Sequence, residues 1–302
     1  MKTVYEIQKS KVVSHVCTDG RFTGMVHTCQ DDYYRSMIIS AVVAYRYGVR
    51  ILCFCHMSSH SHFVISCDSV ELATTFIEAY KREYSRYLSR EKEITKVYND
   101  VKVFVSQIED NRYLRNCISY VLLNPVAAGI CKSPEEYPYS SFRAYFSDMP
   151  LNGKNVSEMG VRKAIRLFKT NQDLSNSGFE IDGENHLELK SFVDYTFVEA
   201  LFVNRTWFYK SLALTNSADE EMKYVPQTCR FSDMDILAEV LEIAENRFGK
   251  AKLQLLTRDQ KISMIPAIHR KTRATNKRIA RVLRLPSKVV DRLFGNSEDF
   301  AE

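Results

Sequence analysis

The segment VRILCFCHMSSHSHFVISC, residues 49–67, decides the fold of the first half of the chain. Val49–His56 and His60–Cys67 are two apolar, strand-like runs, and Met57-Ser58-Ser59 between them has the length of a turn. Two strands joined by so short a connection pair in antiparallel fashion. We therefore expect a β-hairpin here.

Strand-like and helix-like patterns alternate on both sides of this hairpin. Asp31 is the expected N-cap of the helix before it, and Gly48 is its expected stop. The other elements follow from apolar spacing of period two or 3.6. The expected elements outside the hairpin are a strand over Lys11–Cys17, a helix over Asp31–Tyr47, a helix over Val70–Leu88, a strand over Val101–Val105 and a helix over Asn111–Ala128.

The resulting order, βαββαβα, predicts an α+β domain over residues 1–148. It is typical of ferredoxin-like or RRM-like domains, in which helices pack on a mainly antiparallel sheet. We expect the helices on one face of the sheet and the other face open to a ligand. Nucleic acid is a ligand that often lies on such a face.

Composition bounds the rest of the chain. With 302 residues and 45% apolar content, the chain can form about two domains with real cores. The eight cysteines include no CxxC pair and follow no secretory segment, which indicates reduced thiols and a cytoplasmic protein. No apolar run approaches the roughly 20 residues that a membrane helix needs, so no membrane span or membrane partner is expected.

Charge is distributed unevenly along the chain. The net charge is +5, yet residues 258–292 hold eleven basic and two acidic residues, a balance of +9. Residues 172–222 hold three basic and ten acidic residues, a balance of −7, within turn-rich sequence. We therefore expect an acidic, partly helical connecting region over 149–229 and a basic helical DNA-binding domain over 230–302.

Within the basic domain the helical spacing resembles a helix-turn-helix. After a helix over Asp235–Phe248 come two short ones, Asn276–Leu283 and Ser287–Phe294, with Ser287 as N-cap and Arg284-Leu285-Pro286 as their connection. A solvated basic bundle is the alternative. Basic side chains contact phosphates whatever the base sequence. The candidate DNA-binding residues are Arg273, Lys277, Arg278, Arg281, Arg284, Lys288 and Arg292.

The first candidate functional residues are the two histidines of His60-Ser61-His62. Residues i and i+2 of a strand point to the same side, so both imidazoles can reach one ion. Two other interpretations stay open. The pair can be polar strand residues facing solvent, or it can join the nearby His56 in a zinc site.

The second set of candidate functional residues is Tyr120 and Asn124, which Pro125 follows directly. Positions i and i+4 share one face of a helix, so the phenol and the amide project into the same space. Tyr120 can then attack while Asn124 completes a metal shell. The alternative is a core tyrosine and a polar residue beside a proline kink.

These residues resemble a known family, the REP-associated tyrosine transposases. YVLLNPVAAG (residues 120–129) and PEEYPYSSFRAY (134–145) are similar to its signature, and MSSHSH (57–62) is similar to its HUH motif of two histidines flanking one residue. Gly48-Val-Arg-Ile-Leu52 also resembles the run that leads into this motif. The resemblance covers about residues 1–148. It departs from the family at Ser61, usually apolar, at Ser58-Ser59, usually Pro-Asn, and at Val101, where an arginine is usual.

The resemblance implies a set of roles. Tyr120 would be the nucleophile, His60 and His62 metal ligands, and Asn124 the third ligand. Two imidazoles and one amide oxygen leave positions open for phosphate oxygens and water, as Mg²⁺ or Mn²⁺ requires. The implied partner is single-stranded DNA with a hairpin from a palindromic repeat, which is cleaved through a 5′-phosphotyrosine and rejoined. The sequence leaves open whether the chain acts as a monomer or a homodimer.

Physical chemistry is consistent with a metal. A free tyrosine, with a pKa near 10, is ionised in about one molecule in a thousand at pH 7, which corresponds to about 4 kcal/mol. A divalent ion on the scissile phosphate lowers the activation barrier for attack by tyrosine.

The competing hypothesis is a nucleic-acid-binding regulator on the same fold without turnover. Metal-dependent covalent attachment to DNA separates the two. A zinc hydrolase ranks third because it does not need Tyr120.

Overall fold

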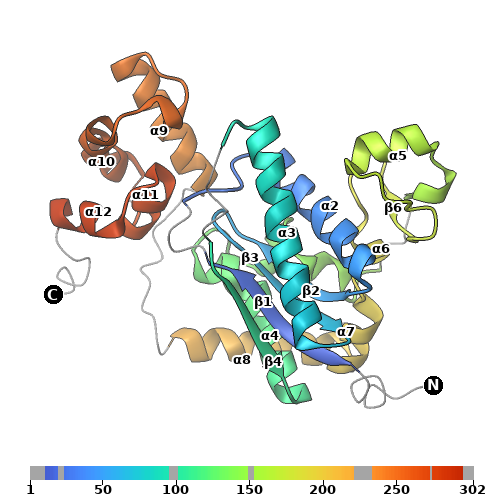
Figure 1. Ribbon diagram of the computed structural model, residues 1–302. Helices are drawn as coiled ribbons and strands as arrows, with labels where there is room; N and C mark the ends of the chain where they lie inside the picture. Colours follow the sequence, from blue (N-terminus) through green and yellow to red (C-terminus); the bar gives the residue numbers. More distant parts are fainter. Residues whose placement is uncertain are drawn as a thin grey trace.

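The structure is a computed structural model that describes residues 11–19, 24–94, 101–148, 153–220, 233–272 and 274–294. Figure 1 shows an α+β body and a separate group of helices formed by the C-terminal part of the chain. Arg273, one of the candidate DNA-binding residues, lies outside the described residues. Among the described residues, no helix is both long and apolar enough to cross a membrane.

The first part of the chain has the expected βαββαβα order. Its four strands form one antiparallel sheet in the order β2-β3-β1-β4. This strand order, with the two chain-adjacent strands β2 and β3 at one side, is that of a ferredoxin-like sheet. The elements are β1 (Val12–Thr18), α2 (Gln30–Tyr47), β2 (Arg50–His56), β3 (Ser61–Cys67), α3 (Val70–Glu91), β4 (Val103–Ile108) and α4 (Asn111–Ala127).

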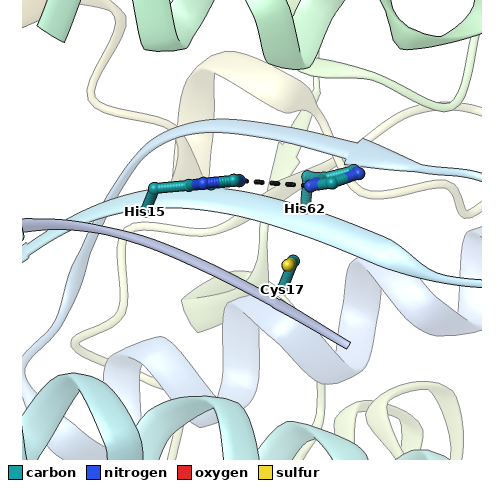
Figure 2. Close-up of side chains that lie close together, drawn as sticks. All are labelled: His15, Cys17 and His62. Carbon is teal, nitrogen blue, oxygen red and sulfur yellow. Dashed lines mark hydrogen bonds between the residues drawn. The ribbon is translucent and has the colours of Figure 1, made fainter. Parts of the chain in front are cut away.

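The two faces of the sheet differ in chemistry. Phe63 of β3 packs edge-on to Phe76 and Tyr80 of α3, with ring centroids 5.3 and 5.0 Å apart. Because side chains alternate along a strand, His62 faces the other side, where it lies opposite Cys17 of β1. Figure 2 shows this second face, with His15, Cys17 and His62 on the neighbouring strands β1 and β3.

The second face is not left open, and in this respect the expectation from the sequence is wrong. Helix α4 packs against β2 and β3 on the face that carries His62, opposite α2 and α3. Its buried side, including Ile118, Val121 and Leu122, is apolar and joins the main core. Phe104 of β4 stays 46% exposed, so the β4 side of this face is accessible.

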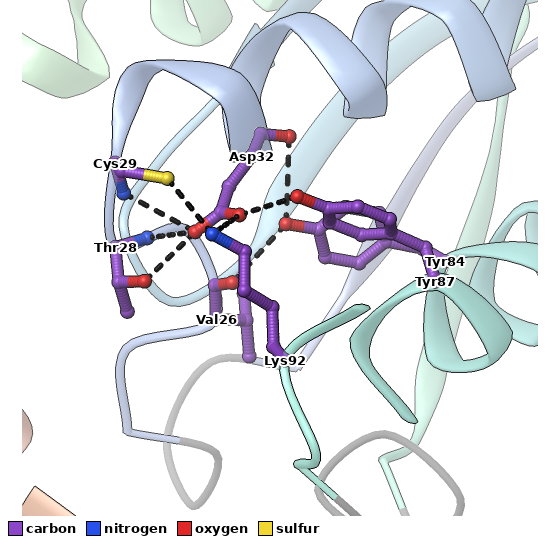
Figure 3. A network of polar contacts seen from close by, with 7 residues as sticks. All are labelled: Val26, Thr28, Cys29, Asp32, Tyr84, Tyr87 and Lys92. Atoms are coloured by element: carbon purple, nitrogen blue, oxygen red, sulfur yellow. Dashed lines mark hydrogen bonds and ion pairs between the residues drawn. The ribbon is translucent and has the colours of Figure 1, made fainter. Parts of the chain in front are cut away.

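Helix α2 is held at its start by a buried carboxylate. Its N-cap is Cys29, not the expected Asp31, because the Asp32 carboxylate accepts hydrogen bonds from the backbone N–H of Thr28 (2.7 Å) and of Cys29 (3.2 Å). Asp32 also accepts from the Tyr87 hydroxyl at 2.7 Å and pairs with Lys92 at 3.1 Å (Figure 3). Gly48 ends the helix as expected, with a left-handed φ of 65°.

The acidic middle segment packs against the first domain instead of only connecting the ends. Buried Val198, Phe202 and Phe208 extend the main core, and Asp194 donates its backbone N–H to Ile51 at the edge of β2. The segment contains β5 (Lys154–Asn155), α5 (Val161–Phe168), β6 (Glu180–Ile181), α6 (Leu189–Phe192), α7 (Tyr195–Phe202) and α8 (Arg205–Glu220). The domain boundaries at residues 148 and 229 stay predictions.

The C-terminal helices have a core of their own. Ile236, Val240, Ile265 and Ile279 are fully buried among them. The two short helices expected from the sequence are present at the expected bounds, with Arg284 in the left-handed region (φ 55°) between them. Their assignment as a helix-turn-helix stays a prediction. The elements are α9 (Asp233–Phe248), α10 (Arg258–Thr272), α11 (Asn276–Leu283) and α12 (Ser287–Phe294).

Asp32 offers a first test of this structure. Burial opposes ionisation of Asp32, but hydrogen bonds from Tyr87 and Thr28 and the bond to Lys92 outweigh it, so its pKa lies below the ordinary 3.8. Asp32→Asn should lower the free energy of unfolding by on the order of 3 kcal/mol because it leaves the Lys92 ammonium without its buried partner. Asp31→Asn, at the exposed neighbouring position, should cost less than about 1 kcal/mol.

Urea unfolding at several pH values measures the free energy of unfolding of both variants. A depressed pKa gives stability that is complete above the ordinary 3.8 and is lost as the pH falls through the lowered value, so the two variants should converge on acidification. Equal stability of the two variants at neutral pH would contradict the role given to Asp32.

Candidate active site

His62 lies at the centre of the polar cluster on the α4 face. Its Nδ1 is 3.1 Å from Nε2 of His15, and the two rings stack with centroids 5.3 Å apart (Figure 2). His15 was not among the residues singled out in the sequence. The signal was present, because His15 and Cys17 have the same i, i+2 spacing on β1 as His60 and His62 have at the start of β3, but only the strand pairing brings the two sets together.

His60 immediately precedes β3 and lies beside His62, with ring centroids 4.7 Å apart. Its Nδ1 is 2.9 Å from the Ser59 hydroxyl, so both histidines have Nδ1 engaged and Nε2 left for an ion. In the described part of the chain, the buried Nε2 of His62 has no hydrogen-bond partner. A buried imidazole nitrogen without a partner fits the requirement of a metal ligand.

The histidines are neutral at neutral pH. Burial, and after it the positive charge of Arg281, lowers the pKa of His60 to about 4. Burial also holds the pKa of His62 well below its ordinary 6.5, with a further contribution from His60 and His15. Metal ligation requires the deprotonated imidazole, so both residues are ready to bind an ion without first losing a proton.

The ring of Tyr120 on α4 stands nearly perpendicular to the rings of His15 and His62, at 83° to each. The centroid of its ring lies 5.9 Å from that of His62 and 6.2 Å from that of His15. The side chain is 44% exposed, so it is not the core tyrosine of the alternative interpretation. The structure therefore brings together three of the four residues singled out in the sequence: His60, His62 and Tyr120.

Asn124 is the fourth, and its side chain makes a hydrogen bond within its own helix. Its Nδ2 donates to the backbone carbonyl of Tyr120, one turn earlier in α4, at 2.9 Å. This bond directs the amide nitrogen along the helix and leaves Oδ1 as the atom that an ion could use. Asn124 as a metal ligand stays a prediction. Helix α4 continues through Pro125 to Ala127.

His56 does not join this cluster, so the alternative zinc site at residues 56–62 is wrong. His56 pairs opposite Ser61, which places it on the α3 face of the sheet. There its Nδ1 bonds to the hydroxyls of Ser61 (2.8 Å) and Ser36 (3.1 Å) within the core. A cavity of about 950 Å³ also lies on that side, lined by residues of α2, α3 and the loop after α5, away from Tyr120.

Comparison with known proteins agrees with this geometry. A family model described as "Transposase IS200 like" matches residues 15–121, a segment that begins at His15 and includes His60, His62 and Tyr120. Residues 15–121, about a third of the chain, are therefore similar to the IS200-like transposases, a family of DNA transposases.

Two further comparisons add little. No curated protein matches the chain. A solved structure described as "Structure of the REP associates tyrosine transposase bound to a REP hairpin" is 14% identical and covers 45% of this chain and 78% of that chain, with a TM-score of 0.35. A likeness that weak carries no argument about this chain.

The C-terminal helices dock beside the histidines of the first domain. The buried carboxylate of Asp233 accepts from the hydroxyl of Ser58, two residues before His60, at 2.7 Å. It is also paired with Arg278 at 2.8 Å and with Arg281 at 3.2 Å. Arg284 donates to the backbone carbonyl of Met25 at 2.8 Å. One carboxylate thus joins α9 and α11 to the loop that leads into β3.

These contacts correct part of the predicted DNA-binding set. Arg278 is 6% exposed and paired with Asp233, so it stabilises the helical domain and is not a surface charge for phosphate. Arg281 and Arg284 are partly buried by the same docking. Lys277, Lys288 and Arg292 are exposed, as a phosphate contact requires. Counting charges over residues 258–292 could not predict this docking, because the partner Asp233 lies outside that segment.

Asp233→Asn should loosen this docking. It leaves the buried Arg278 guanidinium without a counter-charge, which costs about 3–5 kcal/mol for a buried pair. Hydrogen exchange of the backbone amides of α9–α12 measures the effect. The matched control is Glu242→Gln in the same helix, where the exposed pair with Lys271 contributes less than about 1 kcal/mol. Unchanged protection in Asp233→Asn would contradict the docking.

Proposed function

We propose that the chain nicks and rejoins single-stranded DNA by attack of the Tyr120 hydroxyl on a phosphodiester, with Mg²⁺ or Mn²⁺ held by His60, His62 and Asn124. The observation that carries the proposal is the approach of the exposed Tyr120 ring to within 5.9 Å of the His62 ring inside the segment that is similar to the IS200-like transposases. An exposed candidate nucleophile thus lies beside two candidate metal ligands.

The donor set fits a divalent ion with open positions. Two neutral imidazoles and one amide oxygen leave room for water and phosphate oxygens, as Mg²⁺ and Mn²⁺ require. When bound, the ion would polarise the phosphate and stabilise its developing charge. Ser59 and His15 hold the Nδ1 atoms of His60 and His62, so the rings are oriented before any ion arrives.

In the proposed step, the Tyr120 oxygen forms a bond to phosphorus and the bond to the 3′ oxygen breaks. The phenol loses its proton to solvent, and the leaving 3′ oxygen gains one. The DNA is then held as a 5′-phosphotyrosine, whose bond energy allows the reverse attack by a 3′-hydroxyl. No external energy source is needed for rejoining.

Exposed aromatic side chains favour a single strand as substrate. Phe104 pairs opposite Cys17, so it lies on the same face of the sheet as His62, and it is 46% exposed. Bases of an unpaired strand stack on such rings in a sequence-tolerant manner, with about 1–3 kcal/mol for each base. A base-paired duplex hides these base faces, which leaves hairpin loops and flanking single strands as the accessible targets.

The nucleophile is tested by denaturing electrophoresis after incubation with single-stranded hairpin oligonucleotides. Wild type should form a covalent DNA adduct that requires Mg²⁺ or Mn²⁺, and Tyr120→Phe should form none because it lacks the attacking oxygen. Tyr113→Phe is the matched control, since Tyr113 lies on the same helix and is 47% exposed. His60→Ala and His62→Ala should lose most of the adduct.

Two outcomes would overturn this mechanism. Adduct formation by Tyr120→Phe would place the nucleophile elsewhere. Salt-sensitive binding with no adduct across varied hairpins would instead favour the second candidate function, a nucleic-acid-binding regulator that uses the same face. The exposed aromatics and basic C-terminal helices are the features that would serve a pure binder.

We also propose that the C-terminal helices bind DNA phosphates through the exposed Lys277, Lys288 and Arg292. Lys288 and Arg292 are four residues apart on α12, so they share one face of that helix. Replacing all three with Gln should weaken binding and reduce the slope of log affinity against log salt by up to about 3, since each phosphate contact contributes about 0.9. Lys252→Gln, on the connection between α9 and α10, is the control. An unchanged slope in the triple variant would exclude these residues.

A further inference from the structure

A second set of ligand atoms meets on the same face of the sheet. One ligand atom each from His15, Cys17 and His62 lie within 4.8 Å of one another (Figure 2). The strands fix this arrangement, because His15 and Cys17 alternate on β1 and Cys17 pairs directly opposite His62. Two of the three side chains, His15 and Cys17, are only partly buried, so an ion can reach the set.

We propose that His15, Cys17 and His62 form a binding site for a borderline-soft metal ion such as Zn²⁺, a site that shares His62 with the site of the hard catalytic ion but uses its other ring nitrogen. Two imidazoles and a thiolate are a donor set that Zn²⁺ favours and that Mg²⁺ does not. Three protein ligands would leave the fourth tetrahedral position to water. On binding, the Cys17 thiol releases its proton to solvent as the sulfur–metal bond forms.

The spacing fits a tetrahedral ion. With zinc–nitrogen bonds of about 2.0–2.1 Å, two imidazole nitrogens on one tetrahedral ion lie about 3.3 Å apart. The Nε2 of His15 and the Nδ1 of His62 are 3.1 Å apart. With a zinc–sulfur bond of about 2.3 Å, the sulfur lies about 3.5 Å from each nitrogen, so it must move in by at most about 1.3 Å from the 4.8 Å limit. A side-chain rotation of Cys17 supplies a movement of that size without a change in the strands.

Occupation of this site has a consequence for His62. A neutral imidazole has one protonated nitrogen and one with a lone pair, so it offers one nitrogen at a time to an ion. A soft ion on Nδ1 would leave the proton on Nε2, the nitrogen that we assign to the catalytic ion. Resting on the proposed function, this makes the two ions mutually exclusive, and a zinc-loaded chain would be held inactive.

The site is tested with Co²⁺ as a spectroscopic probe on the full chain. Binding of one Co²⁺ should give a thiolate-to-cobalt charge-transfer band in the near ultraviolet and the visible bands of a tetrahedral ion, and Zn²⁺ should displace it. Cys17→Ser should abolish the charge-transfer band, and His15→Asn should weaken Co²⁺ binding. Cys131→Ser, at another partly exposed cysteine, should leave the spectrum unchanged.

The outcomes separate this site from the proposed function. Tyr120→Phe and Asn124→Ala should keep the cobalt spectrum, since neither supplies a ligand to it. Absence of the band in wild type, or its persistence in Cys17→Ser, would overturn the site whatever the DNA assay shows. In that assay, Zn²⁺ should suppress Mn²⁺-dependent adduct formation in wild type and less so in Cys17→Ser. Equal suppression in both would overturn the mutual exclusion. Failure of the wild type to form an adduct, together with a normal cobalt spectrum, would count against the proposed function alone.

Discussion

The antiparallel register of β1 against β3 is the constraint on which the site depends. Phe63 must be buried against Phe76 and Tyr80 of α3, and this apolar contact fixes which face of β3 each residue takes. A slip of one residue would move every side chain to the opposite face and bury His62 in the core. The burial of one phenylalanine thus directs His62 toward α4, where His15, Cys17 and Tyr120 converge.

Local patterns were sufficient to predict the elements and much of the site. The two apolar, strand-like runs around Met57-Ser58-Ser59 predicted the hairpin, and the i, i+2 spacing of His60 and His62 predicted that both imidazoles lie on the same side. Long-range packing could not be read in the same way. The position of α4 over the His62 face and the place of His15 both follow from strand order, which pairs residues about fifty positions apart. Charge counting failed at Arg278 for the same reason, because its partner Asp233 is distant in sequence.

The docked C-terminal helices bring charged side chains close to His60. Asp233 pairs with Arg281, whose charge contributes, after burial, to lowering the pKa of His60. The same carboxylate bonds to Ser58, so the loop before the histidines is supported by a domain that also carries exposed Lys277, Lys288 and Arg292. The loop before His60 and the helices that carry these exposed cations are therefore joined by the hydrogen bond and ion pairs of one buried carboxylate, Asp233.

Mass spectrometry can locate the nucleophile by finding the residue that becomes attached to DNA. The protein is reacted with a single-stranded hairpin and Mn²⁺, digested with nuclease and trypsin, and the peptides are measured. Cleavage after Arg115 and Lys132 releases residues 116–132, in which Tyr120 is the single tyrosine. We expect a nucleotide joined through phosphate to this peptide. A nucleotide on any other peptide, or an unmodified 116–132 peptide from protein that has cleaved its DNA, would contradict the role of Tyr120 as the nucleophile.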